Sequence, residues 1–140
     1  MQVSEVMSRQ VEWIAPDATI TDAAAKMRER DIGALPVAED NRLVGMLTDR
    51  DIVVRCIAGG ADPQQMRVRE VMSERLYFCR EDQSVDSVAS GMGTAQVRRM
   101  PVVDADRRLV GILSLGDVAQ GAQPEATGEA LREIAGPPSE

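Results

Sequence analysis

The sequence predicts an α/β protein, in the α+β sense, made of two copies of one β-α-β-β-α unit. The main observation is an internal repeat, in which LPVAEDNRLVGMLTDRD at residues 35–51 returns as MPVVDADRRLVGILSLGD at residues 100–117. A shorter phrase, VSEVMS at residues 3–8, also returns, as VREVMS at residues 68–73. Because a duplication determines the architecture before any element is assigned, we expect the second half to repeat the fold of the first.

The size and charge of the chain limit the classes of function. Its 140 residues suffice for one domain or for two small halves that share a core. The net charge of -7 argues against nucleic acid or a membrane surface as a partner, because such binding needs a basic face. No apolar run reaches the roughly 20 residues that span a bilayer, and the start lacks the pattern of a signal peptide. We therefore expect a cytoplasmic protein.

The first half is expected to contain three strands and two helices. In order, these are a strand at 11–14, a helix at 20–30, a strand ending at 36–38, a strand at 43–47 and a helix at 49–58. Thr19 is a suitable N-cap for the first helix, and the Gly-Gly pair at 59–60 suits the end of the second. Asp49, Arg50 and Arg55 are expected on the solvent face of that second helix.

The second half repeats this plan. Its expected elements are a strand at 76–79, a helix at 85–96, strands at 100–103 and 109–113, and a helix that starts at 114. Ser84 is the expected N-cap of the first of these helices. Gly91 and Gly93 lie inside it and cost about 1 kcal/mol each relative to Ala, so the helix should depend on packing. A tail helix is expected at 125–135, with loose residues after it.

A repeated motif, in which Asp follows Thr or Ser three residues later, begins the helix after each strand pair. It comprises Thr48 with Asp51, and Ser114 with Asp117. Such a helix start offers backbone N–H groups to a phosphate, and the Asp carboxylate can accept both hydroxyls of a ribose. The same spacing also forms a capping box, which needs no ligand. Carboxylates that face open space would favour the ligand, and carboxylates that cap their own helices would favour the box.

The order of Pro and Val, a polar turn and then G-h-h-[TS]-x-x-D, found twice, resembles a tandem pair of cystathionine β-synthase (CBS) domains, also called a Bateman module. The phrases DIGALPV, GMLTDRDIV and QVRRMPVVD resemble the stand-alone two-CBS proteins of bacteria, including those of stress and hypoxic responses. Residues 1–62 and 66–122 correspond to the two copies, and residues 123–140 form a tail that is partly disordered. The resemblance implies repeats packed about a pseudo-twofold axis and a homodimer.

The resemblance also implies an adenosyl nucleotide in the clefts between the repeats, with the two Asp residues at ribose and the two hydroxyls by phosphate. AMP is the expected ligand, with ADP, ATP, NAD and S-adenosylmethionine as alternatives. The walls of the base slots would be Ile14, Ala34 and Leu35 in one half, and Phe78, Arg99 and Met100 in the other. Arg98 and Arg99 could neutralise a phosphate held from the opposite half, or could form a solvated pair at a strand entrance. The matching Gly33 and Ala34 carry no charge, so the two sites are expected to differ.

No catalytic site is expected. The chain has no histidine, which excludes Ser-His-Asp and Cys-His arrangements and His-metal sites, and it has no P-loop. We therefore expect no enzyme activity, no catalytic cofactor and no metal. Cys56 and Cys79 are expected to be buried free thiols. Two functions remain: a regulatory sensor whose partner reads a ligand-dependent change, or a ligand-independent module that dimerises or docks on another protein.

Overall fold

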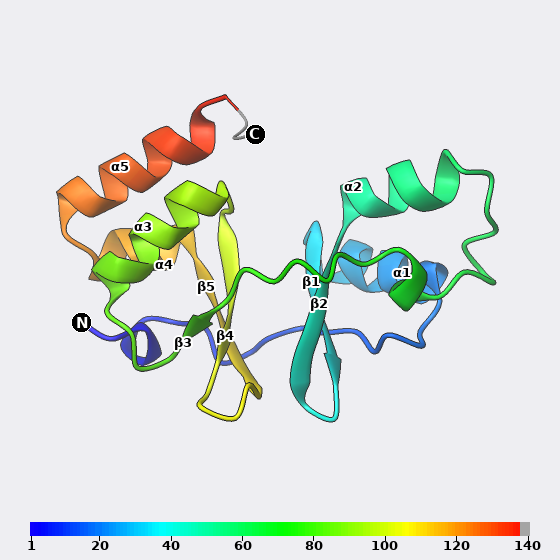
Figure 1. Ribbon diagram of the computed structural model, residues 1–140, viewed down its shortest axis with the longest axis horizontal. Coiled ribbons are helices and arrows are strands. Elements are labelled where there is room, and N and C mark those ends of the chain that lie inside the picture. The colour runs from blue at the N-terminus through cyan, green and yellow to red at the C-terminus, as the bar shows by residue number, and fades with distance from the viewer. Residues whose placement is uncertain (138–140) are drawn as a thin grey trace. The chain divides into compact units, whose positions relative to one another are not determined.

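The chain folds into two compact units, seen in a computed structural model that describes residues 1–137 (Figure 1). We call residues 12–76 the middle unit, and residues 1–11 with residues 77–137 the terminal unit. Each unit contains a hairpin of antiparallel strands and at least one long helix. The predicted mixed α/β class is therefore confirmed. No helix within residues 1–137 has the length and apolar character needed to cross a membrane.

The middle unit follows the predicted order of elements. It contains α1 (Ile20–Arg30), β1 (Ala34–Glu39), β2 (Arg42–Thr48), α2 (Asp49–Asp51), the π-helix η2 (Ile52–Ile57) and the 3-10 turn η3 (Val68–Glu70). Strands β1 and β2 pair antiparallel. The predicted helix at 49–58 is thus one turn of α-helix continued by a π-helix. The predicted strand at 11–14 is reduced to one parallel bridge between Ile14 and Val37.

The terminal unit has the same plan with an added helix. It contains the 3-10 turn η1 (Val3–Glu5), β3 (Cys79–Arg80), α3 (Val85–Ala95), β4 (Arg99–Val103), β5 (Leu109–Ser114), α4 (Leu115–Gly121) and α5 (Pro124–Ala135). Strand β3 pairs parallel to β4, and β4 pairs antiparallel to β5. The predicted tail helix is α5 and begins one residue early, at a Pro suited to a first helical turn. The predicted loose residues 138–140 lie outside the described part.

Helix caps show that the two units fold alike. The Thr19 hydroxyl accepts from the Asp22 N–H at 3.1 Å, as the Ser84 hydroxyl accepts from the Ser87 N–H at 3.2 Å, which confirms both predicted N-caps. The helices α1 and α3 also end alike, because Asp31 and Gln96 both adopt the left-handed conformation, with φ of 53° and 56°.

The opening segment of each sequence repeat packs in the other unit. The Val3 N–H donates to the Gln83 carbonyl at 2.9 Å in the terminal unit. Val68, at the matching position of the second repeat, donates to the Ala18 carbonyl at 2.8 Å in the middle unit. Both valines are fully buried. The compact units therefore do not coincide with the two stretches of repeated sequence.

Each unit has its own apolar core. The core of the middle unit consists of Ile14, Ile20, Ala23, Met27, Leu35, Val37, Leu47, Ile52, Cys56, Val68 and Val71. That of the terminal unit consists of Val3, Cys79, Val85, Val88, Ala89, Met92, Met100, Val102, Leu113, Val118 and Ala130. Helix α5 belongs to the second core through Ala130, which is 1% exposed, and it packs on α3. The added helix therefore covers a face of α3.

The two glycines of α3 should respond in opposite ways to the same substitution. A Cβ at Gly93 would lie 3.1 Å from the Ala130 Cα of α5, whereas a Cβ at Gly91 would meet nothing within 4 Å. We expect Gly91→Ala to raise the free energy of unfolding by about 0.5–1 kcal/mol. Gly93→Ala should lower it by about 1 kcal/mol, because α5 must move away from α3. Urea denaturation of both variants measures this, and equal effects of the same sign would contradict the close α3–α5 contact.

Candidate functional site

The first copy of the repeated motif forms a reciprocal cap at the end of β2. The Thr48 Oγ1 accepts from the Asp51 N–H at 3.1 Å, and the Asp51 Oδ2 accepts from the Thr48 N–H at 3.0 Å. Both residues are half-buried. The short reach of Asp therefore suffices for a capping box, although such boxes usually use Glu or Gln.

The second copy has the same geometry at the end of β5. The Ser114 Oγ accepts from the Asp117 N–H at 3.1 Å, and the Asp117 Oδ2 accepts from the Ser114 N–H at 2.8 Å. Both carboxylates therefore cap their own helices, which is the arrangement expected to favour the capping box. The cap uses Oδ2 alone, and in the described part of the chain Oδ1 of Asp51 and of Asp117 has no hydrogen bond. One acceptor oxygen of each carboxylate thus stays available.

The strand register determines which predicted wall residues share a sheet face with the motif. Ala34 lies opposite Thr48 on β1 and β2, and Arg99 lies opposite Ser114 on β4 and β5. Side chains directly opposite one another in an antiparallel pair point to the same face, with Cβ atoms about 5 Å apart. Ala34 and Arg99 are therefore neighbours of the two hydroxyls.

Two other predicted wall residues lie on the opposite face. Leu35 pairs with Leu47, and Met100 pairs with Leu113. Leu35 is fully buried and Met100 is 4% exposed, each in the core of its unit. Because strand residues alternate between faces, the side chains of these two residues contribute to core packing and not to the face that carries the hydroxyls.

The remaining wall residues, Ile14 and Phe78, are not equivalent in the structure. Ile14 pairs with Val37, and the matching pair in the terminal unit is Cys79 with Val102. Ile14 is a core residue with 7% exposure. Phe78 is half-buried, and the Arg107 guanidinium lies over its ring, 4.8 Å from the centroid. The position equivalent to Phe78 is that of the exposed Trp13.

The residues beside the hydroxyls differ in charge between the units. Arg98 and Arg99 are both exposed, and in the described part of the chain neither forms an ion pair. In the middle unit, the Asp49 carboxylate lies against Gly33, so that a Cβ at Gly33 would be 2.8 Å from its Oδ2. Asp49 was predicted as part of a solvent-exposed helix face, and it is exposed. Its contact with Gly33 was not predicted, although the repeat already matched Gly33 with Arg98.

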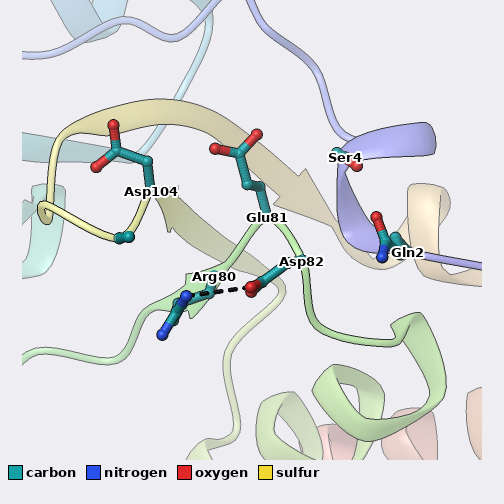
Figure 2. A pocket seen from close by; sticks show the side chains of 7 residues that line it. Gln2, Ser4, Arg80, Glu81, Asp82 and Asp104 are labelled. Carbon is teal, nitrogen blue, oxygen red and sulfur yellow. Dashed lines mark hydrogen bonds and ion pairs between the residues drawn. The ribbon is translucent and has the colours of Figure 1, made fainter.

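A pocket of about 310 Å³ lies elsewhere in the terminal unit (Figure 2). Its lining consists of Gln2, Ser4, Arg80, Glu81, Asp82, Asp104 and Ala105. The Arg80 guanidinium bonds the Asp82 carboxylate at 3.1 Å, so the remaining acids leave the pocket negative and unsuited to a phosphate. No group of three Cys, Asp or Glu side chains placed to hold a metal ion occurs within residues 1–137.

The two cysteines are free and buried, as predicted. Burial raises the pKa of the Cys79 thiol to about 12. The thiol therefore stays protonated at neutral pH and is a poor nucleophile. Cys56 is likewise inaccessible, with no exposed surface. Neither residue supplies a reactive group to the candidate site.

Comparison with known proteins assigns the family. The CBS domain family model matches residues 3–57 and 68–122. The chain is 42% identical over 133 residues to the CBS domain-containing protein YhcV of Bacillus subtilis, with 94% of each chain covered. It is 38% identical over 134 residues to Hypoxic response protein 1 of Mycobacterium tuberculosis, with 95% of this chain and 93% of that protein covered.

Solved structures give the same result. A crystal structure of Hypoxic Response Protein I with two coordinated zinc ions matches with a TM-score of 0.79 and 39% identity, over 88% of this chain and all of that one. A structure of CBSX2 in complex with AMP matches with a TM-score of 0.74 and 27% identity, over 86% of this chain and 95% of that one. The chain therefore belongs to the CBS-domain family, as a protein with two CBS domains in tandem whose relatives include stand-alone hypoxic-response proteins.

Proposed function

We propose that this protein is a cytoplasmic regulatory sensor that binds an adenosyl nucleotide and acts as a homodimer. Among the adenosyl nucleotides, AMP is the first candidate. The observation that carries the proposal is the hydroxyl–Asp pair, which has the same geometry in both units and leaves one carboxylate oxygen available in each. The AMP complex of the related CBSX2 supports the choice of ligand. The absence of histidine supports binding without catalysis.

In this proposal the cap and the ligand use different oxygens of one carboxylate. Oδ2 of Asp51 and of Asp117 stays bonded to the helix start, while Oδ1 accepts a ribose hydroxyl. The cap would then fix the carboxylate before the ligand arrives, which reduces the entropy lost on binding. The hydroxyls of Thr48 and Ser114, and the Arg99 side chain opposite Ser114, would lie on the phosphate side.

Regulation requires that the ligand bind one arrangement of the protein better than another. A ligand bound to one unit stabilises the arrangement in which the carboxylate oxygen and the hydroxyl of that unit are best placed to bind it. A protein partner, or the second copy in a homodimer, would then read the change. The free energy that the ligand contributes to this change is at most the difference between its binding free energies for the two arrangements.

A thermal-melt series tests the binding. We expect AMP at a hundred times its dissociation constant to stabilise the wild type by about 2.7 kcal/mol. For a chain of this size, that raises the melting temperature by about 5–10 °C. The panel contains AMP, ADP, ATP, NAD, S-adenosylmethionine and GMP, on protein freed of carried-over nucleotide. The AMP-induced rise should shrink to less than half in one of the two variants Asp117→Asn and Asp51→Asn, whose amide oxygen can still cap the helix, and the variant that loses the rise identifies the occupied site.

Two variants control for the cap itself. Thr19→Ala and Ser84→Ala remove N-caps that lie outside the hydroxyl–Asp motif, and each should lower the free energy of unfolding by about 1 kcal/mol. Their AMP-induced rise in melting temperature should nevertheless equal that of the wild type. An equal loss of the AMP effect in these variants and in the Asp variants would mean that helix stability, and not ribose binding, governs the response.

The formed capping boxes favour a second candidate, a structural module that dimerises or docks on a partner without a ligand. Under this alternative, none of the six compounds changes the melting temperature, although Asp51→Ala and Asp117→Ala still destabilise the protein by about 1 kcal/mol. Sedimentation of the wild type with and without AMP then gives the oligomeric state and shows whether AMP changes it.

A further inference from the structure

The two units differ in charge at two matched positions that are joined by one backbone hydrogen bond. In the middle unit the Asp49 N–H donates to the Gly33 carbonyl at 2.9 Å, and in the terminal unit the Leu115 N–H donates to the Arg98 carbonyl at 2.8 Å. The same backbone contact therefore joins Gly and Asp in one unit, and Arg and Leu in the other. Each contact lies directly beside the hydroxyl of the repeated motif, Thr48 or Ser114.

In the middle unit the Asp49 carboxylate lies close to Gly33. The Asp49 Oδ1 accepts from the Arg50 N–H at 2.8 Å. Its Oδ2 lies only 2.8 Å from the position of a Cβ at Gly33, a distance at which any side chain would have to displace it. The carboxylate thus occupies the space that a side chain at position 33 would need. A negative charge is held there, one residue after Thr48.

In the terminal unit the matched residues carry positive charge instead of negative charge. Leu115 supplies no charge, Arg98 replaces the glycine, and Arg99 lies opposite Ser114 in the strand pair. Counting the motif carboxylates as well, the middle unit has Asp49, Arg50 and Asp51, whereas the terminal unit has Arg98, Arg99 and Asp117. The first set sums to one negative charge and the second to one positive charge. A phosphate should therefore be repelled by one and attracted by the other.

We propose that the site of the terminal unit takes a phosphate-bearing adenine nucleotide, and that the site of the middle unit takes an adenosyl ligand without negative charge, with Asp49 as the residue that rejects phosphate. This inference rests on the proposed function, since it assigns a ligand class to each of its two sites. Adenosine has no phosphate, which is the group that the charges of the two sites would attract or repel. Both sites should therefore accept adenosine. AMP should occupy the terminal unit alone at concentrations near its dissociation constant.

Titration calorimetry of the full chain with AMP and with adenosine tests this selectivity. The wild type should bind one AMP and two adenosine molecules. Asp49→Asn should bind a second AMP, with affinity at the middle unit increased about tenfold, because one repelling charge is removed. Arg98→Gln combined with Arg99→Gln should weaken AMP binding about tenfold or more, and the ratio of AMP to adenosine affinity should fall by the same factor. Raising the salt concentration should reduce these differences.

Asp40→Asn is the matched control, because it removes an exposed carboxylate of the same unit at the β1–β2 turn, and it should leave the wild-type stoichiometry of AMP unchanged. Two equal AMP sites in the wild type, or no gain of AMP binding in Asp49→Asn, would overturn the selectivity while leaving the proposed function intact. Absence of heat with both AMP and adenosine would overturn the proposed function and the selectivity together.

Discussion

Truncation of one core leucine in each unit, Leu47→Ala or Leu113→Ala, is expected to lower the free energy of unfolding by about 2–5 kcal/mol. Both side chains are fully buried and occupy matched places in the strand pairs, opposite Leu35 and Met100. Their removal loses apolar burial and leaves a cavity that the surrounding strands close only in part. Because small domains have a total stability of about 5–15 kcal/mol, either change removes a large share of it.

Urea denaturation followed by circular dichroism measures the loss. Leu131→Ala is the matched control, because this leucine of α5 is 52% exposed, and it should change the stability by no more than about 0.5 kcal/mol. Since Leu47 and Leu113 occupy matched positions, each in the core of its own unit, we expect losses of similar size from the two variants. A core variant as stable as Leu131→Ala would show that its unit does not pack as described.

Most of the fold could be predicted because the sequence contains the same structural unit twice. The predicted helix at 20–30 matches α1, and the strand pairs are confirmed to within one or two residues at their ends. Periodicity and the N-caps at Thr19 and Ser84 are local signals, so they need no knowledge of tertiary packing. The π-helix η2 was not predicted, because an apolar pattern over six residues does not distinguish α from π geometry.

Features that depend on tertiary contacts could not be predicted. VSEVMS and VREVMS have the same apolar pattern, so nothing local indicates which unit each segment joins. Gly93 was recognised as a cost to its helix, but its reason, the close approach of Ala130, required the position of α5. The motif itself remained open between ligand and cap, and the structure shows the caps formed with one oxygen of each carboxylate left over.

The segments at residues 3–8 and 68–73 explain the glycine of the repeated motif. They also lead to the second large expected effect on stability. A Cβ at Gly111 would lie 2.7 Å from the Met7 Sδ and 2.8 Å from the Ser8 carbonyl oxygen. Ser8 and Ile112 also exchange two backbone hydrogen bonds of 2.9 Å across this contact. We expect Gly111→Val to lower the free energy of unfolding by about 3 kcal/mol or more, because the added atoms push the segment off β5.

Gly45→Val should have the same effect in the middle unit, where a Cβ would lie 2.8 Å from the Met72 Sδ and 3.0 Å from the Ser73 carbonyl oxygen. Urea denaturation measures both losses, and Gly128→Val is the control, because a Cβ there meets nothing within 4 Å. Shortening the methionine in Gly111→Val with Met7→Ala should restore only part of the stability, since the Ser8 oxygen belongs to the backbone and cannot be trimmed. Full restoration would assign the clash to the flexible thioether alone and would remove the steric reason for a glycine at this position.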